Sequence, residues 1–138
     1  MELEEQVMTL IVSAGSCRSM LMEAMRHSRN GEFAQAEQLV EQARGALHAA
    51  HAVQTQLIEA DAGEGKLPVQ IVMVHAQDHV MNAVLLMDLT QEMIAIHRRL
   101  PPCGDKQQSI RGNGLLTVFL LPHLRSKEGG ASGLMPIS

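Results

Sequence analysis

Residues 69–89 read VQIVMVHAQDHVMNAVLLMDL, and this segment decides the fold. Of its 21 residues, 14 are apolar and none is Lys or Arg. A helix of this composition is apolar on nearly all sides, whereas the neighbouring helices of a small bundle cover only one side of it. We therefore expect the remaining surface of this helix to be buried by another copy of the chain. The pattern alone does not distinguish a dimer from a trimer.

A polar stripe interrupts this apolar helix. Its members stand at positions i, i+3, i+4 and i+7, and they are His75, Asp78, His79 and Asn82. This spacing aligns side chains along one face of a helix. Polar groups in an apolar interface cost on the order of a few kcal/mol unless they have partners. The stripe therefore needs an explanation, and the residues admit three.

The first explanation is a polar network that fixes the register of the helices, as a buried Asn does in a coiled coil. The second is a metal site, because HAQDH at 75–79 approximates the H-x-x-E-H of a zinc protease with Asp in place of Glu. A hydrolase also needs a further ligand and a substrate cleft, which a chain this small offers no evident element to build. The third is a phosphorylated histidine. A neutral imidazole with one nitrogen bonded to a fixed acceptor aims the lone pair of the other at phosphorus, and phosphoryl transfer depends mainly on such positioning.

Two more stripes of apolar residues recur every three or four positions before this segment. With the segment above they predict three helices, at 3–29, 32–60 and 68–100. Asn30-Gly31 suits the first turn, Pro68 suits the first position of the third helix, and Pro101 prevents its continuation. Two Phe and no Trp or Tyr in 138 residues disfavour strands. We expect an all-α protein, an antiparallel up-down-up three-helix bundle.

Length and charge limit the domains and partners. We expect one domain at 1–100 and an atypical, mostly mobile C-terminal tail at 101–138, which lacks sustained periodicity. A net charge of −4 and the lack of Trp and Tyr argue against nucleic acid. The longest apolar run, 83–87, is far shorter than the roughly 20 residues that span a bilayer, so we expect no direct membrane insertion. The acidic first residues and only two cysteines, Cys17 and Cys103, favour the cytoplasm.

Four strings resemble the lactose/cellobiose-type enzyme IIA of the bacterial phosphoenolpyruvate-dependent sugar phosphotransferase system. They are GEFAQA at 31–36, AAHAVQTQLI at 49–58, DAGEGK at 61–66 and VHAQDHVM at 74–81. The loop and the second helix are more similar to the cellobiose and diacetylchitobiose branch than to the lactose branch. Because the membrane enzyme IIC chooses the sugar in such systems, the resemblance implies a β-linked disaccharide such as cellobiose, diacetylchitobiose or lactose, without selecting one.

The resemblance implies a homotrimer with the third helix of each chain near the shared axis. It implies that His75 accepts a phosphoryl group from the histidine-containing phosphocarrier protein and passes it to a cysteine of enzyme IIB. His79 would border and orient the phosphoryl site. Asp78 would meet its two symmetry mates and share a divalent cation, Mg²⁺, for which oxygen ligands are suitable. An alternative from another class is a non-catalytic helical oligomerisation module whose stripe only binds metal.

Other polar residues on these helices receive smaller roles. In a helix that begins at Pro68, His75 would lie about two turns inside, too deep for the helix dipole to assist a phosphate much. Gln77 points away from His75, so its contact would be between chains or purely structural. The histidines expected to pack, hydrogen-bond or occupy helix ends or the tail are His27, His48, His51, His97 and His123.

Overall fold

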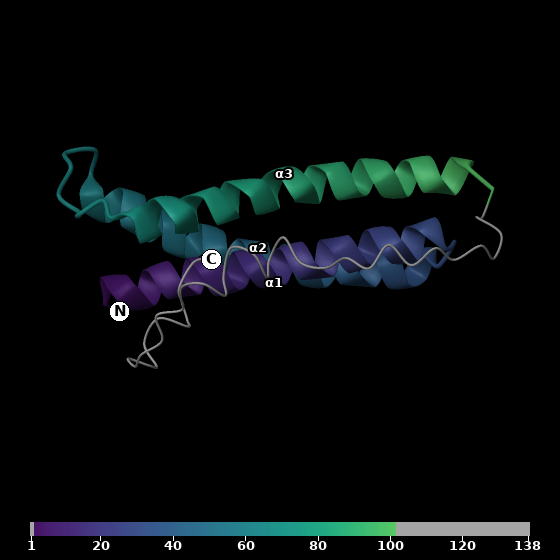
Figure 1. Cartoon of the computed structure of the whole chain (residues 1–138), viewed down its shortest axis with the longest axis horizontal. Helices are drawn as coiled ribbons and strands as arrows, with labels where there is room; N and C mark the ends of the chain where they lie inside the picture. Colours follow the sequence, from purple (N-terminus) through teal and green to yellow (C-terminus); the bar gives the residue numbers. More distant parts are fainter. Residues whose placement is uncertain (1, 102–138) are drawn as a thin grey trace, which may run out of the picture. The chain divides into compact units, whose positions relative to one another are not determined.

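The structure, a computed structural model, describes residues 2–101, which form three α-helices (Figure 1). The helices are α1 (Leu3–Arg29), α2 (Phe33–Asp61) and α3 (Ile71–Arg99). The described residues contain no strand, and their chain runs up, down and up again. The predicted all-α three-helix bundle is therefore confirmed. The predicted tail at 101–138 lies outside the described residues apart from Pro101.

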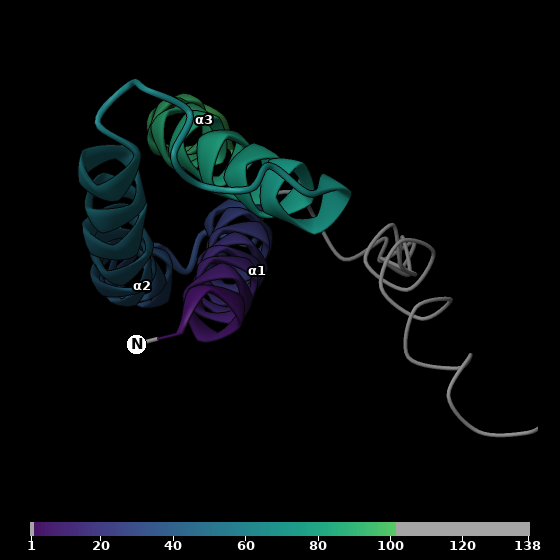
Figure 2. The same cartoon turned by 90° about the vertical axis from the view of Figure 1, so that its left-hand side faces the viewer.

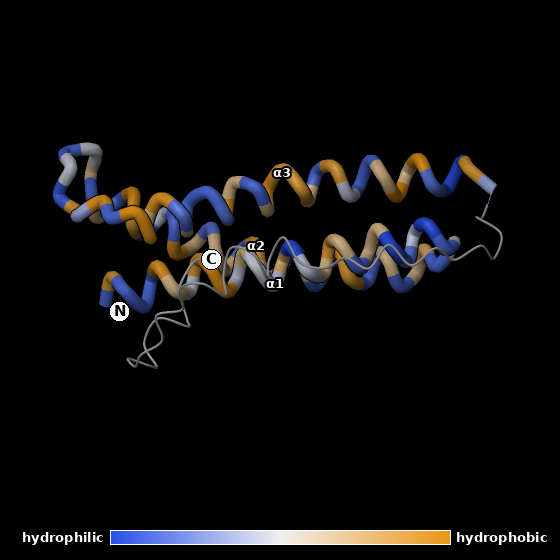
Figure 3. Tube along the Cα trace, viewed as in Figure 1, coloured by the Kyte–Doolittle hydropathy of each residue, from blue (hydrophilic) through white to orange (hydrophobic). Residues whose placement is uncertain are grey.

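The three helices lie at the corners of a triangle when they are viewed from one end (Figure 2). Hydrophobic stretches recur along the whole length of each helix (Figure 3), and the buried ones meet in one core. Leu10, Leu21 and Val80 are among its largest fully buried side chains, and each helix also contributes buried alanines. Because the chain reverses twice, α1 and α3 run in the same direction and begin at the same end of the bundle (Figure 1).

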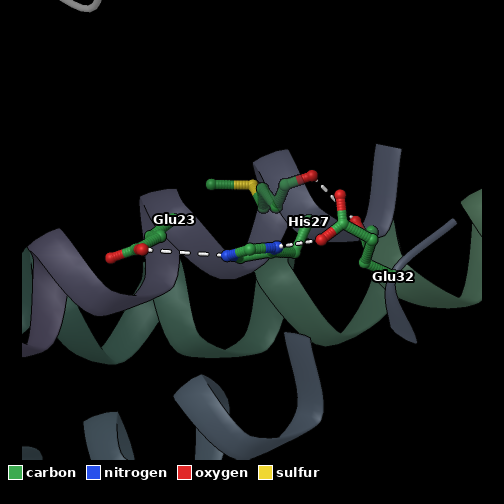
Figure 4. Close-up of polar contacts among 5 residues, drawn as sticks. Glu23, His27 and Glu32 are labelled. Carbon is green, nitrogen blue, oxygen red and sulfur yellow. Dashed lines mark hydrogen bonds and ion pairs between the residues drawn. The ribbon is translucent and has the colours of Figure 1, made fainter. Parts of the chain in front are cut away.

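The turn between α1 and α2 contains Gly31, as predicted. Its φ of +79° lies in the left-handed region, which glycine adopts without steric cost. His27 contacts acidic residues on both sides of it: Nδ1 is 2.9 Å from Glu32 Oε2, and Nε2 is 3.7 Å from Glu23 Oε1 (Figure 4). Glu32 is the N-cap of α2 rather than its first helical residue, and α2 continues one residue past its predicted end, to Asp61.

The third helix begins three residues later than predicted, at Ile71 rather than at Pro68. Gln70, the N-cap of α3, is extended, with φ −90° and ψ 160°. The reason is tertiary, because the Asp61 carboxylate accepts a hydrogen bond from the Leu67 N–H at 3.0 Å, which folds the loop back on the end of α2. The residues between Leu67 and Ile71 must then reach the start of α3. They are extended because an extended residue covers about 3.3 Å along the chain, whereas a helical residue covers about 1.5 Å.

The last turn of α3 is bonded to both other helices. His97 Nδ1 lies 2.9 Å from Oγ of the buried Ser28 in α1, whose hydroxyl donates to a backbone carbonyl, so Nδ1–H is the donor of this pair. Arg98 forms an ion pair with Glu37 of α2 and lies over the Phe33 ring, 4.9 Å from its centroid. These contacts fix the end of the bundle that contains the α1–α2 turn.

Within residues 2–101, no helix has the length and apolar character needed to cross a membrane. Cys17 is fully buried in the core, and burial raises the pKa of its thiol. A buried thiol with a raised pKa is unreactive, as the sequence suggested. Cys103 lies outside the described residues.

Candidate functional site

His75 and His79 lie one turn apart on α3 and contact each other. Their Nε2 atoms are 3.0 Å apart, and their rings meet edge to face, with centroids 4.4 Å apart and planes at 86°. Because two lone pairs at this distance would repel, one Nε2 donates a proton to the other. Both side chains are half-buried, so the pair is held in place yet open to solvent.

The charge state of His79 follows from its surroundings. Burial of the ring, the neighbouring His75 and the Arg18 guanidinium lower the pKa of His79, while the Asp78 carboxylate acts in the opposite direction. His79 is therefore neutral at pH 7 and carries one N–H. When this proton is on Nε2, it is donated to His75 Nε2 and fixes the lone pair of His75 at the surface. Such a lone pair is a nucleophile.

Asp78 and Asn82 continue the polar stripe into solvent. Both are exposed, and Asn82 Nδ2 donates to Asp78 Oδ2 at 3.2 Å. Within residues 2–101 of one chain, no group of three or more His, Cys, Asp or Glu side chains could hold a metal ion. The Asp78 carboxylate is the type of ligand that Mg²⁺ prefers. One chain supplies only this carboxylate, so a magnesium site here requires Asp78 from further copies.

Gln77 is directed toward α2. Its Oε1 accepts a hydrogen bond from Nε2 of the buried Gln54 at 2.6 Å. This contact lies within one chain and is structural, which is one of the two possibilities that the sequence left for Gln77. It fixes α3 against α2 beside the histidine pair.

The position of His75 in α3 differs from the prediction. Because α3 begins at Ile71, His75 is its fifth residue and does not lie two turns inside. A helical side chain tilts back over the preceding turn, so the His75 imidazole lies over the first turn of α3. The helix dipole acts within that turn and favours a negative charge there. The prediction that His75 lies about two turns inside the helix was therefore wrong.

Arg18 belongs to this neighbourhood, although the sequence pattern did not reveal it. Its side chain is half-buried on α1, and its charge acts on His79. Spacing along a single helix cannot show a charge effect that acts from α1 on α3. One signal was present in the sequence, since Arg18 is the only charged residue between positions 6 and 22.

The remaining histidines have other surroundings. His48 and His51 are exposed on α2, while His27 and His97 form the contacts at the helix ends described above. His123 lies outside the described residues.

A row of apolar side chains on α3 is left uncovered by this chain. Each has at least half of its surface exposed, and the members are Val74, Met81, Leu85, Leu89 and Ile96. We call these five residues the α3 stripe. They follow one another at intervals of four or seven residues, which keeps them on one face of the helix. Asp78 lies on the same face, four residues after Val74 and three before Met81.

Comparison with known proteins shows sequence relatives over most of the described chain. The family "PTS system, Lactose/Cellobiose specific IIA subunit" matches residues 5–98. The chain is 50% identical over 99 residues to the N,N'-diacetylchitobiose-specific EIIA component of Escherichia coli, which covers 72% of this chain and 85% of the relative. It is 37% identical over 90 residues to the lactose-specific EIIA component of Lactococcus lactis, covering 65% and 86%.

Solved structures of related proteins share the fold. The cellobiose-specific enzyme IIA of Bacillus anthracis is 34% identical, with a TM-score of 0.68, covering 72% of this chain and 92% of that one. IIA(Chitobiose) of Escherichia coli, solved in complex with HPr, is 47% identical, with a TM-score of 0.63, covering 72% and 96%. The chain therefore belongs to the lactose/cellobiose-specific IIA subunit family of the sugar phosphotransferase system and is a phosphotransferase component of that system.

Proposed function

We propose that this protein is a cytoplasmic phosphohistidine carrier that receives a phosphoryl group on His75 from HPr, the histidine-containing phosphocarrier protein. It passes the group to a cysteine of enzyme IIB during uptake of a β-linked disaccharide. The observation that carries the proposal is the 3.0 Å contact between the Nε2 atoms of His75 and His79 at the surface. The Escherichia coli relatives support HPr as the donor and diacetylchitobiose as the type of sugar.

In the first transfer, His75 Nε2 attacks the phosphorus atom of the donor phosphohistidine in line with the bond that breaks. The donor N–P bond breaks, and its electron pair returns to the donor imidazole as the new N–P bond forms on His75. The His75 ring keeps its proton on Nδ1, so this step transfers no proton. His79 Nε2–H, freed from the lone pair that it had bonded, donates to a phosphoryl oxygen. The first turn of α3 adds its positive dipole end to this stabilisation.

In the second transfer, a cysteine thiolate of enzyme IIB attacks the same phosphorus atom in line. The S–P bond forms as the N–P bond to His75 breaks, and the electron pair returns to His75 Nε2. The hydrogen bond from His79 then forms again. The half-exposed position of the pair favours access by two protein partners in succession.

We infer further that the carrier is a homotrimer assembled through the α3 stripe. The support is the exposure of five large apolar side chains on one face. Asp78 lies on that face, so a three-fold axis along it would bring three carboxylates together. Such carboxylates repel strongly unless a cation or protons neutralise them. One Mg²⁺ shared by Asp78 of the three subunits meets this requirement.

Intact-protein mass spectrometry tests the carrier proposal. The protein is incubated with phosphoenolpyruvate and the two general proteins of the system, one of which is HPr. We expect the mass of one phosphoryl group to be gained, to be lost in acid, and to be absent from His75→Ala. His48→Ala, which removes an exposed histidine of α2, is the matched control and should be phosphorylated like the wild type.

The alternative, a metal-binding oligomerisation module without catalysis, gives the opposite result. In that case the mass of the wild type stays unchanged while HPr in the same mixture becomes phosphorylated. A phosphate that persists in His75→Ala would also contradict the proposal, because another residue would then be the acceptor.

A further inference from the structure

The two histidines of α3 are placed so that both can bind one metal ion. His75 and His79 stand at positions i and i+4 of the same helix, and their Nε2 atoms are 3.0 Å apart. The nitrogen of a neutral imidazole is the commonest protein ligand of transition metals. Because both nitrogens already face the same point, one ion can contact the two without any change in the backbone.

The separation of the two nitrogens selects the type of ion. Bonds from imidazole to a metal are about 2.0–2.1 Å long, so two nitrogens 3.0 Å apart subtend an angle of roughly 95° at an ion that binds both. This angle is close to the roughly 90° between neighbouring ligands of square-planar and octahedral ions, and smaller than the roughly 109° of the tetrahedral sites typical of Zn²⁺. Ni²⁺ and Cu²⁺ adopt the first two geometries with nitrogen ligands.

The surroundings hold the histidine pair in position. Ala76 and Val80, which directly follow the two histidines, are fully buried in the core. Between them, Gln77 accepts the hydrogen bond from Gln54 of α2 at 2.6 Å. Both histidine side chains are half-buried, so their freedom is already restricted while solvent still reaches them. An ion that binds there orders little that was free, and water can fill its remaining coordination positions.

We propose that His75 and His79 together bind Ni²⁺ or Cu²⁺ through their Nε2 atoms, and that the bound ion blocks phosphorylation of His75. The proton that one Nε2 donates to the other moves, through solvent, to Nδ1 of the ring that carried it. Each neutral ring therefore keeps one proton, and both Nε2 lone pairs face the ion. The block rests on the proposed function of His75, because the ion occupies the lone pair that would attack phosphorus. The binding itself does not depend on that function.

Isothermal titration calorimetry with NiCl₂ tests the binding, on protein without a polyhistidine tag and in a buffer that does not chelate metals. We expect at least about tenfold weaker association in His75→Ala and in His79→Ala than in the wild type, because each variant retains only one of the two ligands. His48→Ala removes an exposed histidine of α2 and should bind Ni²⁺ like the wild type. MgCl₂ should give no heat that depends on the pair, because Mg²⁺ prefers oxygen ligands.

The phosphorylation assay with Ni²⁺ added tests the block. At a Ni²⁺ concentration about ten times the measured dissociation constant, about one chain in eleven remains free, so phosphorylation of the wild type should slow about tenfold. HPr in the same mixture should still become phosphorylated, which shows that the donor proteins tolerate the metal. EDTA in slight excess over Ni²⁺ should restore the rate. His48→Ala should be slowed and restored in the same way.

The outcomes separate the site, the block and the carrier proposal. Equal Ni²⁺ binding by the wild type and both variants of the pair overturns the site, and loss of binding in Asp78→Asn alone would assign the ion to carboxylates instead. A wild type that binds Ni²⁺ through the pair and is phosphorylated at its normal rate overturns the block. A wild type that accepts no phosphate even without Ni²⁺ defeats the carrier proposal, while the calorimetry still decides the site. Circular dichroism confirms that the variants remain helical.

Discussion

His79 is kept neutral by the fold, and this links the site to pH. Its pKa is lowered first by burial and then by His75; the Asp78 carboxylate opposes this, and Arg18 adds the smallest lowering effect. In the unfolded chain the same ring has an ordinary histidine pKa of about 6.5. Protonation therefore favours the unfolded state, which binds the proton more readily. The stability that the neutral ring contributes is present above about pH 6.5 and is lost as the pH falls through the lower pKa of the folded state.

We expect the wild type to lose stability more steeply than His79→Gln when the pH falls from roughly 7.5 to roughly 5.5, across the ordinary histidine range. Glutamine keeps a polar side chain but does not titrate. Urea unfolding at both pH values, followed by circular dichroism, measures the two free energies of unfolding. Equal pH dependence in the two proteins would show that protonation of His79 does not oppose folding.

At this scale the spacing predicted which residues share one helix face, but not the contacts between them. The i, i+3, i+4, i+7 spacing was enough to place His75, Asp78 and His79 on one face, because all three belong to one helix. The Nε2-to-Nε2 contact depends on ring rotation, which spacing does not determine. The effect of Arg18 on His79 was missed because it acts between two helices, and single-helix periodicity contains no information about the neighbour.

The boundaries of the helices show where local chemistry determines an element and where it does not. The turn at Gly31 was predictable, because few residues other than glycine adopt its backbone angles easily. The start of α3 was not, because the fixed φ of Pro68 suits both a first helical turn and an extended chain. The extended form is favoured by the Asp61–Leu67 hydrogen bond and by the distance from Leu67 to the start of α3. Neither feature can be seen in the sequence around Pro68.

Ala62, directly after α2, offers a test at the level of this element. It has a φ of +50°, in the left-handed region, which costs a residue with a Cβ about 1 kcal/mol or more. We expect Ala62→Gly to raise the free energy of unfolding by about 0.5–1 kcal/mol after the greater flexibility of glycine in the unfolded chain is deducted. Urea unfolding curves measure the change.

The matched control is the same substitution two residues earlier. Ala60 lies within α2 and is exposed, so Ala60→Gly should lower the free energy of unfolding by about 0.5–1 kcal/mol. Changes of the same sign in both variants would mean that the backbone angle at Ala62 is not what limits stability there.

For the molecule as a whole, the α3 stripe is the surface through which we propose that copies of the chain associate. Five large apolar side chains on one face remain in water, although the interior of the bundle is already filled. This surface was predictable from residues 69–89, because the segment has more apolar residues than one bundle can cover. The number of copies was not predictable from the same residues, because burial alone does not select a symmetry.

We expect Leu85→Glu to dissociate the assembly into single chains at concentrations where the wild type is associated. A carboxylate in the middle of the α3 stripe would have to be buried without a partner, which is strongly unfavourable. Sedimentation velocity measures the mass in solution. Ile58→Glu, at an apolar position of α2 with 64% of its surface exposed, is the control and should leave the mass unchanged. A wild type that sediments as a single chain would rule out the trimer.

The bond between Ser28 and His97 is the one side-chain hydrogen bond that joins α1 to α3 among the described residues, and it lies at the end remote from His75. Near His75, no side-chain hydrogen bond within the described residues joins α1 to α3. Separating the two helices at that end therefore breaks fewer bonds than separating them at the turn between α1 and α2. A partner protein that docks on His75 meets the end of the helix pair that yields more easily.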